Sequence, residues 1–142
     1  MANNKLMKWA LVGIGISLLL YVGSIVYFEA RLGYLQPQGS TSLLLATFDS
    51  NDKRHERVLR LEQMEGKHYI AVNHWPRRWY RHALGNPNVE AKMPGEENFR
   101  PFQAIPLDGE ELRRISEQYA VGLNFRIRTG FPPRRFLRLD PA

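Results

Sequence analysis

The chain opens with a long apolar run and then changes to short segments of alternating polarity. Trp9–Phe28 (WALVGIGISLLLYVGSIVYF) contains no charged residue. At about 1.5 Å per residue, a helix of this length rises about 30 Å, the thickness of the hydrocarbon core of a bilayer. We therefore predict a transmembrane helix over residues 9–28, preceded by a basic N-terminus over residues 1–8 that carries Lys5 and Lys8.

A buried core helix and a cleaved signal peptide are the two alternatives to a membrane span for the apolar run. A buried helix in a core this small rarely needs so long a run without a charge. A cleaved signal peptide agrees with Lys5 and Lys8, but the run is long for one and no A-x-A-like cleavage site follows it. The expected protein is a single-pass membrane protein of the bacterial inner-membrane type. Lys5 and Lys8 before the span, against Arg31 after it, favour a cytoplasmic N-terminus by a narrow margin, so the side of the domain is left open.

The remaining residues predict a linker and one β-rich domain. Residues 29–41 are interpreted as the linker, because Gly33, Pro37 and Gly39 interrupt any period. Over residues 42–142, runs of strand length alternate with turns, including the polar turn Asp49–His55 and the hairpin signal Glu65-Gly66. The predicted strands are Ser42–Phe48, Arg57–Leu61, Lys67–Val72, Asn88–Met93, Phe99–Ile105 and Arg135–Leu139.

Two helices are predicted between these strands. The first is opened by Pro76 and ended by Gly85. The second runs from Gly109 to about Tyr119, with Asp108 and Glu111 spaced as a capping box. Most connections between strands are too short for parallel crossovers. The fold class is therefore mainly β (α+β): a transmembrane helix followed by a small antiparallel barrel with two helices at its edges.

Composition and motifs exclude several kinds of chemistry. The chain has no cysteine, which excludes a disulfide scaffold, an iron–sulfur cluster and a thiol nucleophile. It also lacks GxSxG, GxGxxG and GxxxxGK[ST] motifs, so acyl transfer and nucleotide-triphosphate chemistry have no support. None of the four histidines has the spacing of a ligand pair, and no metal site is predicted.

The formal net charge of +6 is concentrated near the C-terminus. Three interpretations stay open: anionic lipid headgroups beside a membrane-tethered domain, a phosphate-bearing ligand held by arginine, and a solvated basic face. Nucleic acid is not an expected partner. The residues concerned are Arg126, Arg128, Arg134, Arg135 and Arg138, with Phe125, Phe131 and Phe136 between them.

The stretch His74–Val89 (HWPRRWYRHALGNPNV) is the most specific part of the chain. It resembles the W-Y…N-P-x-V signature of the deazaflavin-dependent nitroreductase and quinone reductase family. The closing segment Arg135–Pro141 is similar to the R-x-x-x-L-x-P strand of that family. The resemblance covers about residues 42–142 and implies a split β-barrel related to the flavin-nucleotide-binding barrels.

The chain departs from this family at the phosphate-binding turn. Members that bind the deazaflavin coenzyme F(420) have a G-R-K-S-G-like turn after the first strand, whereas Asp49–His55 (DSNDKRH) contains no glycine. The resemblance implies F(420) or FMN as the cofactor, with Tyr80 or His74 as a proton donor; packing alone is the alternative role for Trp79 and Tyr80. The implied cofactor contacts are Lys53, Arg54, Arg57, Asn73 and Trp79.

Two functions follow from these observations. The first is a membrane-anchored oxidoreductase that passes hydride from a deazaflavin or flavin to a quinone-like or nitroaromatic acceptor. The second is a cofactor-free split-barrel binding or assembly module tethered to the membrane. The resemblance favours the first function, whereas the glycine-free turn favours the second. Membrane lipid and a quinone are the expected partners, and a homodimer is left open.

Overall fold

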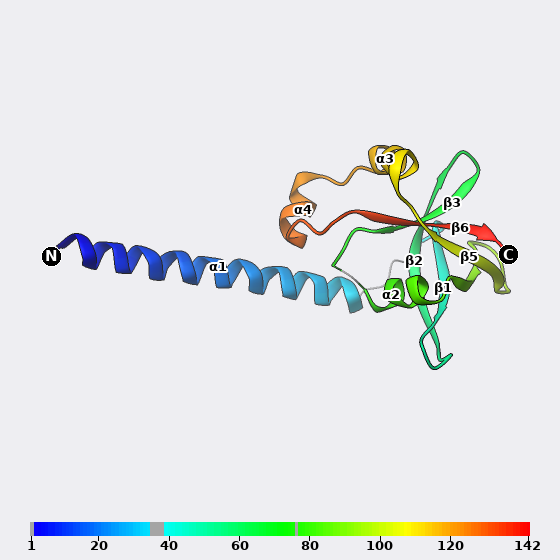
Figure 1. The fold of residues 1–142 in the computed structure, drawn as a ribbon, viewed down its shortest axis with the longest axis horizontal. Coiled ribbons are helices and arrows are strands. Elements are labelled where there is room, and N and C mark those ends of the chain that lie inside the picture. Colours follow the sequence, from blue (N-terminus) through cyan, green and yellow to red (C-terminus); the bar gives the residue numbers. More distant parts are fainter. Residues whose placement is uncertain (1, 35–38, 76) are drawn as a thin grey trace.

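The structure is a computed structural model, and it describes residues 2–34, 39–75 and 77–142. Pro37 and Pro76, which the sequence places in the linker and at the start of a helix, lie outside these residues. Figure 1 shows one long helix projecting from a small barrel. In chain order the elements are α1 (Ala2–Tyr34), β1 (Ser42–Phe48), β2 (Arg54–Met64), β3 (Lys67–Val72), α2 (Arg78–Gly85), β4 (Asn88–Lys92), β5 (Arg100–Pro106), α3 (Gly109–Gln118), α4 (Leu123–Thr129) and β6 (Arg135–Pro141).

Six antiparallel strands form a closed barrel in the order β1-β2-β3-β6-β5-β4. Met64 pairs with Lys67 across a two-residue turn, in which Glu65 and Gly66 both have positive φ. Turns of this kind follow the natural twist of two antiparallel strands. The predicted mainly β, α+β barrel behind an N-terminal helix is confirmed.

Strand β2 is longer than the sequence predicts. It begins at Arg54, so Arg54 and His55 are not part of the polar turn but pair with Phe48 and Thr47 of β1. Ladder hydrogen bonds to β1 outweigh the low strand preference of this charged segment, because strand formation depends on cross-strand neighbours. The prediction of a turn through His55 was therefore wrong at its last two residues.

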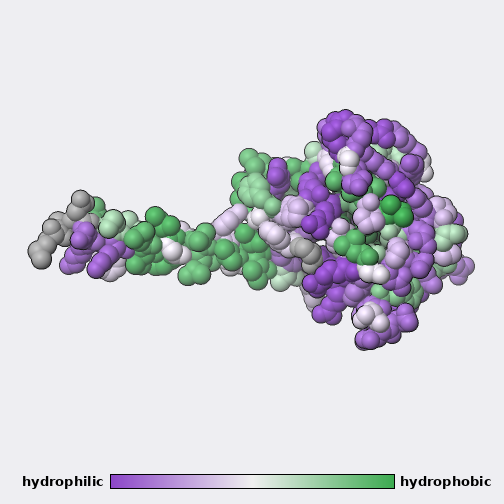
Figure 2. Space-filling view, in the orientation of Figure 1, coloured by the Kyte–Doolittle hydropathy of each residue, from purple (hydrophilic) through white to green (hydrophobic). Residues whose placement is uncertain are grey.

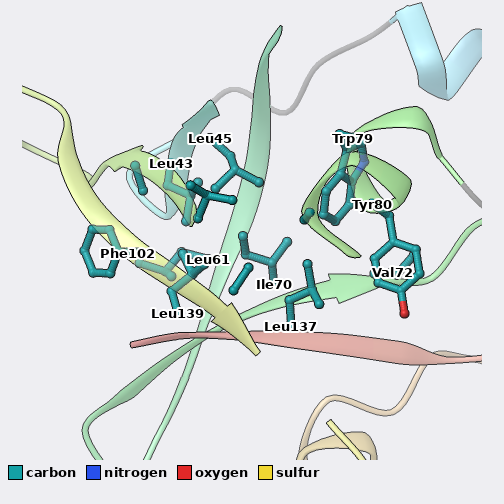
Figure 3. Close-up of a cluster of buried hydrophobic side chains, with 14 of the residues drawn as sticks. Leu43, Leu45, Leu61, Ile70, Val72, Trp79, Tyr80, Phe102, Leu137 and Leu139 are labelled. Carbon is teal, nitrogen blue, oxygen red and sulfur yellow. The ribbon is translucent and has the colours of Figure 1, made fainter. Parts of the chain in front are cut away.

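The barrel interior is filled by aliphatic side chains, and α2 adds its aromatic face to the same cluster. Figure 3 shows Leu43, Ile70 and Leu137 from different strands in one cluster with Trp79 and Tyr80 of α2. Trp79 is 8% exposed and Tyr80 5% exposed. Both aromatic residues are thus part of the core, the packing role that the sequence left as an alternative.

Helix α3 is attached to the barrel by a polar network and not by the predicted capping box. Asp108 forms no side-chain cap hydrogen bond. Glu111 instead accepts hydrogen bonds from the hydroxyl of Tyr69 at 2.8 Å and from Nη1 of Arg138 at 2.7 Å. The capping-box prediction was wrong because Glu111 is held by the Tyr69 hydroxyl and the charged guanidinium of Arg138 on strands of the barrel.

Helix α4 was expected to be irregular, so the barrel carries three helices where the sequence predicted two. It ends at Gly130, whose φ of +70° is a conformation that glycine adopts without strain. A Cβ atom at Gly130 would come within 2.7 Å of Cδ1 of Ile25 on α1. The glycine therefore lets the end of α4 approach α1 closely.

Helix α1 extends beyond the predicted span and through the first part of the predicted linker. Its segment Asn4–Leu32 is long and apolar enough to cross a membrane, and none of its most apolar window is buried inside the molecule. The apolar residues of this segment are therefore largely exposed in the structure. Glu29 and Arg31 fit the last helical turns because both are good helix formers.

We predict that Glu111→Gln lowers the free energy of unfolding by about 1–2 kcal/mol, because it weakens two hydrogen bonds that hold α3 to the barrel. Denaturant unfolding of the full chain in detergent measures the change. Glu110→Gln is the matched control: Glu110 pairs with Arg113 on the surface of the same helix, and we expect a change within about 0.5 kcal/mol. Equal effects of the two substitutions would contradict this account.

Candidate functional site

The structure separates the predicted site residues into three groups. Lys53 ends the β1–β2 turn and Arg54 begins β2, four other predicted residues line one cavity, and Tyr80 lies in the core. The cavity is about 440 Å³ and is formed by β2, β3, the residues around the start of α2, the end of α1 and residues 118–121. The four predicted residues at this cavity are Arg57, Asn73, His74 and Trp79.

The Asp49 carboxylate accepts the hydrogen bonds offered by the β1–β2 turn. Oδ1 of Asp49 accepts backbone N–H bonds from Asn51 at 2.9 Å and from Lys53 at 3.1 Å. Oδ2 lies 2.8 Å from Nε2 of His55, which must be the donor because a carboxylate only accepts. The hydrogen bond from His55, followed by that from Asn51, lowers the pKa of Asp49 to about 2. A carboxylate therefore already occupies the backbone donors that a phosphate would need.

Arg54 is also engaged by acidic side chains. Its Nε donates to Glu56 at 3.0 Å, and its Nη1 donates to Glu90 on β4. The guanidinium carbon lies 4.3 Å from the centroid of the Phe99 ring. Two carboxylates neutralise this cation, so the turn does not fit the phosphate of a flavin or deazaflavin.

The cavity has a different electrostatic character, because three arginines reach it. Arg57 and Arg60 come from β2, and Arg77 precedes α2. Burial, and then the nearby charge of Arg77, lowers the pKa of Arg57 from its usual value. The two guanidinium groups thus repel each other across a partly enclosed space. Glu29 already offsets the charge of Arg77, and a further anionic group between the two guanidinium groups would lower their repulsion.

Two carboxylates lie beside these cations: Glu62 pairs with Arg60 at 3.1 Å, and Glu29 reaches Arg77 from the last turns of α1. Oε2 of Glu29 accepts from Nη2 of Arg77 at 2.7 Å, and its Oε1 lies 3.0 Å from Nδ1 of His74. The side chain of Glu29 is only 13% exposed. One carboxylate therefore joins the apolar helix to the residues of the cavity.

Contacts from the α3–β6 region fix the remaining cavity residues. Nε of Arg134 donates to Oδ1 of Asn73 at 3.2 Å. The ring of His74 packs edge-to-face on Phe125 of α4, with centroids 5.4 Å apart. These contacts leave the side chains little freedom, so the cavity is largely preformed.

Apolar side chains form the rest of the wall. Leu32 contributes from α1, Val72 from β3 and Trp79 from α2. Tyr80, predicted as a proton donor, is not among the cavity-lining residues; it lies in the core, and Arg135 stacks over its ring at 5.9 Å. The cavity thus combines charged groups with an apolar wall, as small-molecule sites commonly do.

The sequence did not single out Glu29, Arg60 or Arg77 as site residues. Glu29 is the first charged residue after the apolar run, and that position was its only signal. Arg77 lies inside the stretch that carries the family resemblance, but its pairing with Glu29 depends on how α1 meets the barrel. Among residues 2–34, 39–75 and 77–142, no group of three His, Cys, Asp or Glu side chains is arranged to hold a metal ion.

Neither a protein-family model nor a curated protein matches the chain. Solved structures do share its fold. A structure described as an F420-H2 dependent reductase is 17% identical, covers 75% of this chain and 99% of its own, and has a TM-score of 0.54. A putative pyridoxamine 5'-phosphate oxidase from Listeria innocua is 14% identical, covers 72% of this chain and 84% of its own, and has a TM-score of 0.53.

A third similar structure, described as a domain-swapped dimer, is 18% identical, covers 75% of this chain and 82% of its own, and has a TM-score of 0.56. At such identities the likeness shows the fold alone, which is a split β-barrel. Membership of the deazaflavin-dependent nitroreductase family stays a prediction.

We predict that the Asp49 carboxylate stabilises the chain in a defined pH range. Its folded pKa of about 2 lies below the usual 3.8, so its contribution is complete above about pH 4 and is lost as the pH falls towards 2. Asp49→Asn should therefore be less stable than the unaltered chain at pH 7, with a difference that shrinks below pH 4. Denaturant unfolding as a function of pH measures this, and a difference that persists unchanged to pH 2 would contradict it.

Proposed function

We propose that the protein is a membrane-anchored split-barrel oxidoreductase that holds a phosphate-bearing flavin or deazaflavin in the cavity between Arg57 and Arg77. The observation that carries the proposal is the pair of guanidinium groups at one partly enclosed site with an apolar wall. Guanidinium groups bind phosphate through short, charge-assisted hydrogen bonds. The phosphate would thus be held by side chains of β2 and α2 and not by the β1–β2 turn.

The bound flavin or deazaflavin would supply the hydride-transfer chemistry. The chain would hold the cofactor, exclude water with Val72 and Trp79, and hold a proton for the acceptor at His74. Because Nδ1 of His74 is bonded to Glu29, that proton would leave from Nε2. Tyr80 is buried in the core, so we assign this role to His74.

Anchoring by α1 would place the cavity close to lipid-soluble acceptors. Leu32 lines the cavity and ends the segment that is long and apolar enough to cross a membrane. A quinone-like acceptor that moves along α1 would reach the cavity without crossing bulk water. A nitroaromatic compound is the second acceptor class that a reduced flavin of this kind would serve. A homodimer stays a prediction.

A specific observation favours a second function, that of a cofactor-free binding or assembly module tethered to the membrane. Asp49 satisfies the backbone donors of the β1–β2 turn, which is the position where a flavin phosphate would be expected from the family resemblance. On this alternative the cavity would bind an anionic ligand without any redox reaction.

The proposal is tested by titrating the full chain in detergent with FMN and with the deazaflavin coenzyme, using visible absorbance and thermal melts. We expect saturable binding of at least one of them. Arg57→Ala should weaken it roughly 10- to 100-fold, the loss expected when a charged hydrogen bond to phosphate is removed.

Arg54→Ala is the matched control, since Arg54 lies outside the cavity and pairs with Glu56 and Glu90. Its affinity for the same cofactor should change little. If a well-folded chain binds neither cofactor, the module alternative is favoured. Equal weakening by the Arg54 and Arg57 substitutions would show that the phosphate is not held in the cavity.

A further inference from the structure

Helix α4 and the residue just beyond it present apolar side chains that remain largely exposed, although Arg126 stacks over the ring of Phe131 at 5.2 Å. Leu123 is 64% exposed, Ile127 42% and Phe131, just beyond the helix, 47%. Leu123 and Ile127 are four residues apart and so lie on the same face of the helix. Figure 2 shows hydrophobic atoms over the region of α4 as well as along α1.

The cations around this surface fall into two classes. Arg134 donates to the carbonyls of Ser116 and Tyr119, and Arg138 pairs with Glu111 and Asp140. Both are therefore structural, as is Phe136, which is 1% exposed. Arg126 and Arg128 of α4 differ, since within the described residues neither pairs with a carboxylate. No Asp or Glu occurs in the sequence between Gln118 and Asp140.

Helix α4 packs beside the last part of the apolar run of α1. The hydroxyl of Tyr21 donates to the carbonyl of Ile127 at 2.9 Å, and the rings of Phe28 and Phe125 lie 6.3 Å apart. Tyr21 precedes Phe28 by about 10 Å at the rise of an α-helix. The contact thus lies alongside the uncharged run and not beyond its end.

These positions determine the depth of α4 if α1 spans a bilayer. The hydrocarbon core takes up about 20 residues of a helix, and the headgroup layers lie on either side of it. Arg126 and Arg128 keep α4 out of the centre of the hydrocarbon. An amphipathic helix with this pattern of apolar and basic residues settles about 5–10 Å into the boundary between headgroups and acyl chains.

We propose that α4 is a second membrane contact, which seats the barrel on an anionic lipid surface. Leu123, Ile127 and Phe131 enter the acyl boundary, while Arg126 and Arg128 bind lipid phosphates. This inference goes beyond the proposed redox function and rests on its anchoring by α1. Anionic lipid is the occupant because the exposed face is continuous with a membrane-span candidate and because its charge is entirely positive.

Seating α4 in this way would also fix the position of the cavity above the membrane. Nε1 of Trp75 donates to the carbonyl of Thr129 at 2.7 Å, and His74 packs on Phe125. Trp75 and His74 lie in the segment that leads from β3 to α2. Their contacts fix the cavity relative to α4, so the opening of the cavity would lie at the level of the lipid headgroups.

The test uses the natural absence of cysteine, which makes any introduced thiol unique. Full-length Leu123→Cys and Ile127→Cys chains carry an environment-sensitive fluorophore in vesicles containing phosphatidylglycerol, with spin-labelled lipids as quenchers. Leu18→Cys in α1 reports the membrane span. Asn98→Cys is the exposed control, in the β4–β5 connection at the end of the barrel away from α1 (Figure 1).

We expect blue-shifted emission and strong quenching at positions 123 and 127, and no quenching at 98. If the label at position 18 is quenched but the labels at positions 123 and 127 are as little quenched as the label at position 98, the inference is overturned and the α1 anchor remains. Absence of quenching at 18 would overturn both the anchor and this inference. Disulfide formation between two Ile127→Cys chains, in place of quenching, would show that a second copy covers the face.

The charge requirement is measured separately with Arg126→Gln/Arg128→Gln in the Ile127→Cys background. We expect greater quenching in phosphatidylglycerol vesicles than in phosphatidylcholine vesicles for the parent, and loss of that difference in the double variant. An unchanged difference would show that these two arginines do not bind the headgroups. Quenching at position 18 serves as the control that insertion of α1 is unaltered.

Discussion

Closure of the barrel by its last strand is the constraint on which the rest of the structure depends. An open sheet exposes unpaired N–H and C=O groups along its edges. Strand β6 pairs with β3 on one side and β5 on the other, so no edge remains. Because β5 and β6 are neighbours in the sheet yet distant in sequence, residues 107–134 must travel outside the barrel. That excursion contains α3 and α4, and it brings α4 beside α1 and residues 118–121 to the wall of the cavity.

The sequence predicted the barrel well because its signals are local. Strands β1 and β3 have the predicted bounds, and the Glu65-Gly66 turn specifies its own hairpin. Helix α4 was missed because its seven residues contain two exposed arginines and no strong start signal. It is stabilised by packing on α1, which lies about a hundred residues earlier. The capping box failed for a related reason, since Glu111 is held by distant strands.

The site was only partly predictable, because some of the residues that contact one another in it lie far apart in the sequence. Arg57, Asn73, His74 and Trp79 belong to the barrel, so the family resemblance could indicate them. Glu29 belongs to a helix outside the resemblance, and its role depends on where α1 meets α2. Composition could show that the β1–β2 turn lacks glycine. Composition could not show that the Asp49 side chain accepts the backbone N–H bonds of the turn in place of a ligand phosphate, because this depends on how the turn folds.

The uneven pairing of charges connects the two proposed ligands. Several cations of the barrel are paired within the chain: Arg54, Arg100, Arg113 and Arg138 each contact a carboxylate. Beside α1 the pairing is less complete: Arg77 contacts Glu29, whereas Arg126 and Arg128 of α4 contact no carboxylate among the described residues. Cations crowded in this way destabilise one another unless external anions approach them. A phosphate in the cavity and lipid phosphates at α4 would each supply that charge, and both would do so at the end of the molecule that we propose faces the membrane.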